Sequence, residues 1–346
     1  DLRKTVVKEV KRSLVLGMSP RILVEGPFGI GKTQLLQCVK SDLTKDETAY
    51  AIYFQVPAIH RRGKLHEILG PGLEAMVQDF VMGLFEKSFY ESKSSGTDLS
   101  QMLGVSGDVA KAITTAIESD NKYEFWKWLK GQKLTASELR KLGLTSSTIP
   151  EDSLVSVFNA IGRLTRKHMN KPLVFLIDEC EYLAPLVGDY FSVVAAGFRG
   201  LMDEGGSVGL VFAISGRMED VRVFKQPEIS RRLSSPLIHM TEYTIDQAEE
   251  FVQQVVAYVR AEDYKERMRT AVKNHNEKLS DRFYPFSDKA IGTIIDKAVV
   301  KADRDQVKGL RPKDILFYMD NSLGEVLLSN KEYYAIESGI VERVAK

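Results

Sequence analysis

A glycine-rich stretch at residues 26–33, GPFGIGKT, fits the pattern G-x-x-x-x-G-K-[ST]. Glycines let successive backbone N–H groups turn toward phosphate oxygens, and the N-terminus of a following helix adds the positive end of its dipole. Lys32 would then reach the β- and γ-phosphates of ATP, and the hydroxyl of Thr33 would ligate Mg²⁺. An ordinary turn does not require Gly-Lys-Thr in this order, so we expect a nucleotide-binding loop. Its predicted binding residues are Gly26, Pro27, Phe28, Gly29, Ile30, Gly31, Lys32, Thr33 and Gln34.

An acidic pair, Asp178 and Glu179, ends the apolar stretch LVFLIDE at residues 173–179. Asp178 could hold Mg²⁺ through water, so it is a predicted nucleotide and metal ligand together with Thr33. Glu179 is placed to polarise an attacking water as a base. Two acids at a helix N-terminus would look the same, but the upstream glycine-rich loop favours catalysis.

These residues need a scaffold that brings two distant stretches together, and the hydrophobic pattern indicates one. Five β-rich stretches alternate with helical patterns, namely RILVEG, AYAIYFQV, KPLVFLIDE, GSVGLVFAISG and SPLIHMTEY at 21–26, 49–56, 171–179, 206–216 and 235–243. The third stretch is nearly all apolar before its acids, as expected for a strand buried on both faces of a sheet. The alternation predicts an α/β fold with a parallel sheet and helices on both faces.

The long interval at about 61–170 contains no convincing strand, and helical patterns dominate it. We therefore expect a helical insertion between the second and third strands. After about Ile245 the sequence again favours helices to its end. The expected organisation is a core over residues 1–244, which contains the insertion, and a helical region over 245–346.

The composition of the chain restricts its expected partners and its cellular compartment. The 346 residues carry a formal net charge of +1, which gives no global attraction to nucleic acid or membrane. No apolar run reaches the length of a bilayer span, so no membrane partner is expected. Cys38 and Cys180 are too few for a disulfide framework and favour a reducing, cytoplasmic compartment. Without a visible signal peptide, the start at Asp1 is expected to be a trimmed end.

The order of the motifs resembles the AAA+ ATPases. GPFGIGKT followed by LVFLIDECEYL is similar to their two nucleotide-binding motifs, especially in the branch of replication initiators and transposition or defence ATPases. The resemblance implies a P-loop NTPase core with a C-terminal helical lid. It also implies that Ser215 is a polar sensor of the nucleotide, that Arg231 or Arg232 is an arginine finger, and that Arg311 contacts the γ-phosphate. The arginine pair could instead make local salt bridges, and Arg311 could cap the lid.

A narrower resemblance lies in the expected insertion. FWKWLKGQKLTASELRKLGL at 125–144 is similar to a segment of ATP-binding proteins in BREX-type phage-exclusion systems. Its residues Trp126 and Trp128 are expected to serve packing, because large aromatic side chains dominate core burial.

The function expected from the motifs and the resemblance is ATP hydrolysis by a homo-oligomer that acts on double-stranded DNA, with other proteins of a replication or defence system. The alternative is an ATP-gated assembly switch with little turnover. Both need Lys32 and Asp178, and only hydrolysis needs Glu179. A kinase is disfavoured because no acceptor-binding motif is visible.

For Gln55 and for the basic stretch at 60–64, the sequence allows two interpretations each. Gln55 could hold Glu179 in an inactive pose, or it could be solvated at the end of its strand. The basic stretch HRRGK at 60–64 could contact the phosphate backbone of DNA or form solvated surface charge.

Overall fold

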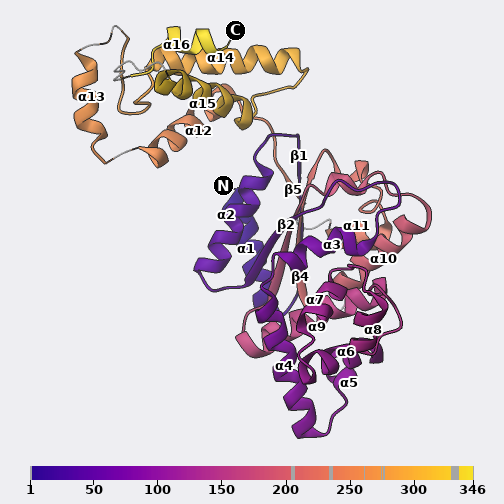
Figure 1. Cartoon of the computed structure of the whole chain (residues 1–346). Coiled ribbons are helices and arrows are strands. Elements are labelled where there is room, and N and C mark those ends of the chain that lie inside the picture. Colours follow the sequence, from indigo (N-terminus) through magenta and orange to yellow (C-terminus); the bar gives the residue numbers. More distant parts are fainter. Residues whose placement is uncertain are drawn as a thin grey trace. The chain divides into compact units, whose positions relative to one another are not determined.

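The chain divides into two compact units, which are described separately (Figure 1). The computed structural model describes residues 2–203, 207–233, 237–260, 262–273, 275, 277–328 and 335–345. The first unit comprises Asp1–Gly26 and Lys32–His239, and the second comprises Pro27–Gly31 and Met240–Lys346. The assignment of residues 1–244 as a functional core and 245–346 as a lid stays a prediction.

The first unit is built on a five-stranded parallel sheet in the order β2-β3-β4-β1-β5. Its strands are β1 (Arg21–Gly26), β2 (Tyr50–Gln55), β3 (Leu173–Asp178), β4 (Val208–Ser215) and β5 (Leu237–His239). Each strand lies inside a stretch that the sequence predicts as one, so the predicted α/β fold is confirmed. Positions 206, 235 and 236 of the predicted stretches lie outside the described residues.

Helices cover both faces of this sheet, which explains why β3 is buried along its whole length. On one face α1 (Leu2–Val15) packs on α2 (Lys32–Lys45), and α2 lies against β1, β2, β3 and β4. The other face is covered by α3 (Leu65–Glu74), α9 (Glu151–Met169), α10 (Gly188–Asp203) and α11 (Pro227–Leu233) (Figure 1).

The parallel strands place all their carboxyl ends at one edge of the sheet. In register, Gly26 at the end of β1 lies opposite Ser215 of β4. Gln55 at the end of β2 lies opposite Asp178 of β3. This edge is where open α/β sheets bind their ligands, and it gathers the predicted site residues of three strands.

The interval at 61–170, all of it described, is helical and contains no strand, as the sequence predicts. Between α3 and α9 it forms α4 (Gln78–Ser95), α5 (Leu99–Leu103), α6 (Gly107–Glu118), α7 (Lys122–Leu129) and α8 (Ala136–Leu142). Because α3 packs on β2 and α9 on β3 and β4, the helices added to the sheet layers are α4 to α8. Trp126 and Trp128 of α7 are 7% and 1% exposed, which confirms their packing role.

Among the described residues, no single helix has the length and apolar composition needed to cross a membrane. Taken together, α3 and α4 pass that test, although they are bent by 95° at the break between them.

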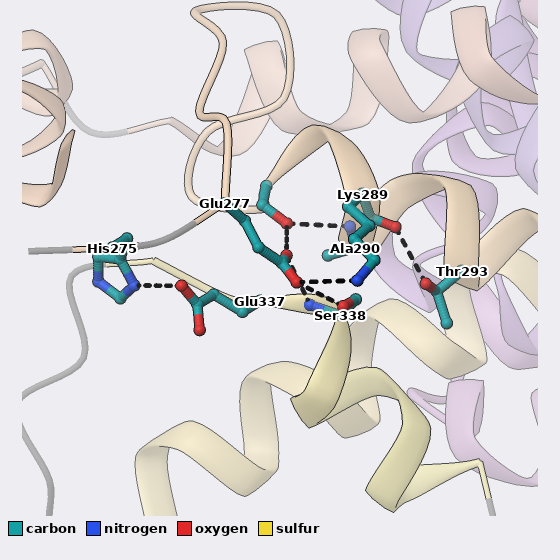
Figure 2. A network of polar contacts seen from close by, with 8 residues as sticks. His275, Glu277, Lys289, Ala290, Thr293, Glu337 and Ser338 are labelled. Atoms are coloured by element: carbon teal, nitrogen blue, oxygen red, sulfur yellow. Dashed lines mark hydrogen bonds and ion pairs between the residues drawn. The ribbon is translucent and has the colours of Figure 1, made fainter.

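The second unit is helical and has an apolar core of its own. Its helices are α12 (Ile245–Val259), α13 (Tyr264–Val272), α14 (Asp288–Arg304), α15 (Pro312–Leu328) and α16 (Ser338–Val344). Glu277 joins the starts of α14 and α16, because its carboxylate accepts from the hydroxyls of Ser287 and Ser338 and, at 2.9 Å, from the backbone N–H of Ser338 (Figure 2). His275 Nδ1 lies 3.1 Å from Glu337 Oε1 in the same network.

Candidate nucleotide-binding and catalytic site

The glycine-rich loop connects the end of β1 at Gly26 to the start of α2 at Lys32. Gly29 and Gly31 have φ angles of +83° and +101°, a backbone region that residues with a Cβ rarely adopt. The glycines of the motif therefore stand where this loop needs them. The chain then enters a helix of 14 residues, and the first N–H groups of a helix, which lack acceptors within it, suit a phosphate. Gln34 is exposed on the first turn of that helix.

Lys32 is a buried cation at the base of this loop. Its residue is 7% exposed, and its ammonium donates to the Gly26 carbonyl at 3.0 Å. Burial lowers the pKa of Lys32, although the charges of Glu181 and Asp178 partly oppose this effect. A desolvated ammonium beside a helix N-terminus suits a phosphate, which would supply the negative charge that burial makes favourable.

Asp178 is 2% exposed and is the centre of a hydrogen-bonded group. Its Oδ2 accepts from Thr33 Oγ1 at 2.6 Å and from the Tyr53 hydroxyl at 3.0 Å. Its Oδ1 accepts from the backbone N–H of Glu179 at 2.9 Å. The structure thus brings Thr33 and Asp178 together, although 145 positions separate them. A hydroxyl and a carboxylate are hard oxygen ligands, so the pair fits Mg²⁺.

Glu179 follows the end of β3 with a φ of +57°, in the left-handed region that is uncommon for a residue with a side chain. This backbone turn starts the short 3₁₀ helix η1 (Cys180–Leu183). Burial raises the pKa of Glu179, and the neighbouring charges of Asp178 and Glu181 raise it further. A carboxylate with a raised pKa is a stronger base, which suits the predicted role toward water.

Glu181 links β3 to the end of β4, because its Oε2 accepts from the backbone N–H of Ser215 at 3.0 Å. The predicted sensor Ser215 therefore lies at the same edge as Asp178 and Gly26. Sensing of nucleotide by its side chain stays a prediction.

A second buried acid, Glu25, lies on the strand that precedes the loop. Glu25, 6% exposed on β1, accepts from the backbone N–H of Met218 at 2.8 Å. Its other oxygen lies 2.7 Å from Nδ1 of His239 at the end of β5. Glu25 thus ties β5 and the 3₁₀ helix η2 (Met218–Asp220) to the strand that leads into the loop.

Tyr53, Glu181 and Glu25 were not identified by the sequence reasoning. Glu25 could have been found, because it is a charged residue inside an apolar strand. Glu181 could have been considered as the third acid of DECE at 178–181. Nothing in the sequence distinguishes Tyr53 from the chain's other tyrosines.

The arginine pair lies at the opposite end of the sheet. Arg232, on α11, pairs with Asp203 and donates to the carbonyl of Glu228. Its charge also lowers the pKa of Arg21, after the larger effect of burial, so Arg232 lies near the start of β1. Arg231 is exposed on the same helix. The structure does not bring either arginine to Lys32, which stands beyond the other end of β1.

The remaining candidate residues are Arg311 and Gln55. In the second unit, Arg311 Nε donates to Asp314 at 2.6 Å, and its other end pairs with Asp305. Both contacts lie within the second unit, and the two predicted roles of Arg311, capping and contact with the γ-phosphate, stay predictions. Gln55 is exposed and lies beside the Tyr53 hydroxyl, since it acts on the pKa of that group.

Comparison with known proteins gives matches only among solved structures: no protein-family model matches the sequence, and no curated protein matches it. The Aeropyrum pernix ORC2 protein, solved as ADPNP–ADP complexes, aligns with a TM-score of 0.54 and 10% identity over 99% of this chain and 66% of that one. The A. pernix ORC1 protein in complex with DNA gives 0.48 and 11% over 99% and 63%, and the Thermotoga maritima RuvB Holliday junction branch migration motor gives 0.43 and 12% over 99% and 66%.

The chain therefore spans just under two thirds of the length of these three proteins. This chain has the fold of the AAA+ ATPases.

Proposed function

We propose that this protein is a Mg²⁺-dependent ATPase. The observation that carries the proposal is the meeting, at one edge of the sheet, of a buried lysine, a hydroxyl bonded to a buried aspartate, and a glutamate with a raised pKa. These are the groups that hold a triphosphate, hold its metal ion and take a proton from water.

Each residue has a separate task. Lys32 neutralises the β- and γ-phosphates, and the loop N–H groups hold their oxygens. Thr33 would hold Mg²⁺ directly and Asp178 through water; the ion would neutralise charge that develops on the transferred phosphoryl group. Glu179 accepts the proton of the attacking water, for which its raised pKa makes it a better base.

We infer further that the working form is a homo-oligomer. Arg231 and Arg232 lie beyond the amino end of the sheet, whereas Lys32 lies beyond its carboxyl end. A finger from these positions would serve the nucleotide of a neighbouring subunit, in a head-to-tail arrangement. Of the two, Arg231 is the better candidate, because it is exposed whereas Arg232 is partly buried.

Double-stranded DNA is the proposed target, supported by the resemblance of the motifs to replication initiators. The basic stretch at 60–64 offers exposed cations, namely His60 when protonated, Arg61, Arg62 and Lys64. A role in phage defence, with other proteins of such a system in the cytoplasm, rests on the resemblance of residues 125–144 alone. Loss of plaque reduction in cells that carry Lys32→Ala would support that role.

The test of the ATPase proposal compares wild type with Lys32→Ala and, as a control, Lys40→Ala, a partly buried lysine farther along α2. Labelled ATP should bind wild type and the control alike, and Lys32→Ala should lose at least about tenfold in affinity, since it lacks a charge-assisted contact worth 1.5–3 kcal/mol. Turnover should require Mg²⁺. Equal ATP binding by all three proteins would refute the site.

ATP binding without hydrolysis would favour the second candidate function. If wild type binds ATP and assembles but does not hydrolyse it, with or without duplex DNA, the protein is a nucleotide-gated assembly switch. Sizing of the protein with ATP and Mg²⁺, before and after addition of DNA, separates these outcomes.

A further inference from the structure

Tyr53 makes a contact that the proposed mechanism does not use. It lies on β2, and its hydroxyl donates to Asp178 Oδ2 at 3.0 Å. The same oxygen accepts from Thr33 Oγ1 at 2.6 Å. Tyr53 thus connects a third strand to the pair of residues that would hold the metal ion.

The contact with Tyr53 limits the number of acceptor sites that Asp178 can offer to another group. An ionised aspartate offers about four acceptor sites. Thr33 and Tyr53 occupy both sites of Oδ2, and the backbone N–H of Glu179 occupies one site of Oδ1. One site remains, on Oδ1, and its direction is fixed because the other three are taken. A water bound to a metal ion would have this single acceptor.

We propose that Tyr53 is a positioning residue for a divalent cation bound with a nucleoside triphosphate: by holding Oδ2, it directs the remaining acceptor site of Asp178 to a metal-bound water. The inference rests on the proposed function, since it needs the cation to bind at Thr33 and Asp178.

The surroundings keep Tyr53 a donor. Burial raises its pKa to about 12, and the neighbouring charge of Asp178 contributes to the rise. The hydroxyl therefore stays protonated at physiological pH. Gln37 of α2 and Gln55 at the end of β2 lie beside this hydroxyl, since both act on its pKa.

Tyr53→Phe removes the hydroxyl and keeps the ring. Tyr50→Phe is the matched control, because Tyr50 is on the same strand, is also partly buried, and packs its ring 4.6 Å from that of Phe80. A fluorescent ATP analogue is titrated with Mg²⁺ on the full chain, and its binding is measured again in EDTA.

For Tyr53→Phe we expect the Mg²⁺ concentration at half-saturation to rise roughly tenfold, the effect of one hydrogen bond to a charged group. Binding in EDTA should equal that of wild type, and Tyr50→Phe should match wild type in both. In an Asp178→Asn background, where the charged acceptor is gone, Tyr53→Phe should have little further effect.

A Tyr53→Phe titration that matches wild type would overturn the inference alone. So would an equal loss of affinity with and without Mg²⁺, because that result indicates a structural role. If wild type itself binds the analogue without any dependence on Mg²⁺, both this inference and the proposed metal site are wrong.

Discussion

At the scale of single residues, the carboxyl edge of the sheet concentrates negative charge. Asp178, Glu179 and Glu181 lie within four consecutive positions, and the charges of the other two raise the pKa of Glu179 after burial does so. Lys32 provides an opposing charge nearby, since both Asp178 and Glu181 act on its pKa. At neutral pH the three ionised carboxylates repel one another, and a bound cation would reduce this repulsion.

Glu179→Gln should stop hydrolysis and leave ATP binding intact. Loss of the base should lower turnover by roughly 10²- to 10⁴-fold, because an amide cannot take a proton from water at neutral pH. The matched control is Glu219→Gln, an exposed acid of η2. An unchanged steady-state rate would assign the base to another residue.

The same variant should be slightly more stable. Because the pKa of Glu179 is raised in the folded protein, the fold favours the protonated form. That stability is complete below the ordinary pKa and is lost as pH rises through the raised one. At neutral pH the ionised side chain therefore destabilises the fold, and glutamine removes the cost. We expect a rise in melting temperature of order 1 °C at pH 7 and none near pH 4.

Glu181→Gln should move the acid limb of the rate profile to lower pH. The substitution removes one of the charges that raise the pKa of Glu179, and its amide oxygen can still accept from Ser215. Glu179 would then stay ionised in more acidic solution. The measurement is kcat/KM between pH 5 and 8 beside wild type and Glu219→Gln. A limb that stays in place would show that Glu181 does not act on the base.

The sequence allows these acids to be predicted only in part. Asp178 and Glu179 end a strand whose apolar run is plain, so their place at the sheet edge follows from the pattern. The role of Glu181 depends on the distance between β3 and β4, and that of Tyr53 depends on the pairing of β2 with β3. Strand order is a property of the whole sheet, and local periodicity does not contain it.

At the scale of elements, strands were predictable and helix partners were not. The strands are short apolar runs bounded by turns, and all of them fall inside the expected stretches. The interval at 61–170 reads as one helical block, yet α3 and α9 are layers of the sheet and α4 to α8 are additions. All these helices bury an apolar face, so the pattern does not show which neighbour covers it.

In the second unit, Glu277 connects two helices, because its carboxylate accepts hydrogen bonds from Ser287 and Ser338 at the starts of α14 and α16 (Figure 2). Burial raises the pKa of Glu277, but the hydrogen bonds from Ser287 and Ser338 outweigh it, so the net pKa is lowered. A lowered pKa means that the ionised form stabilises the fold. This contribution is present above the ordinary pKa and is lost as pH falls through the lowered value.

Glu277→Gln should therefore destabilise the protein at pH 7 by about 1–2 kcal/mol, since charge-assisted hydrogen bonds become neutral ones. The difference from wild type should shrink below about pH 4.5, where the carboxylate of the unfolded chain begins to protonate, and should vanish once pH falls below the lowered pKa of the folded protein. Denaturant unfolding at pH 7, 5 and 3.5 measures it, with Glu342→Gln, an exposed acid of α16, as control. A difference that is constant with pH would contradict the assigned charge.

At the scale of the whole molecule, the sheet separates the two halves of the proposed reaction. Its carboxyl edge holds Lys32, Asp178 and Glu179, and Arg232 lies near the start of β1 at the amino edge. The six residues of β1 span roughly 16 Å at about 3.3 Å per residue, which is too far for a side chain to bridge. A single subunit therefore cannot bring its own Arg232 to its own loop without rearranging the sheet.

This separation predicts that the rate depends on assembly. Activity per subunit should rise with protein concentration as subunits assemble, and Arg231→Ala should lower it by on the order of 10³-fold or more, as removal of a finger in trans does. Arg232→Ala should cost less activity and should lower stability, because it removes the ion pair with Asp203.

Lys32→Ala subunits and Arg231→Ala subunits should each be inactive alone and partly active when mixed. In a head-to-tail assembly formed at random from equal amounts, roughly one interface in four joins an intact loop to an intact arginine, so about a quarter of wild-type turnover should return. A mixture of Lys32→Ala with Glu179→Gln is the control, because both defects lie on the loop side, and it should stay inactive. If the first mixture also stays inactive, and specific activity is constant through full dissociation, the site works within one chain and the arginines on α11 have another purpose.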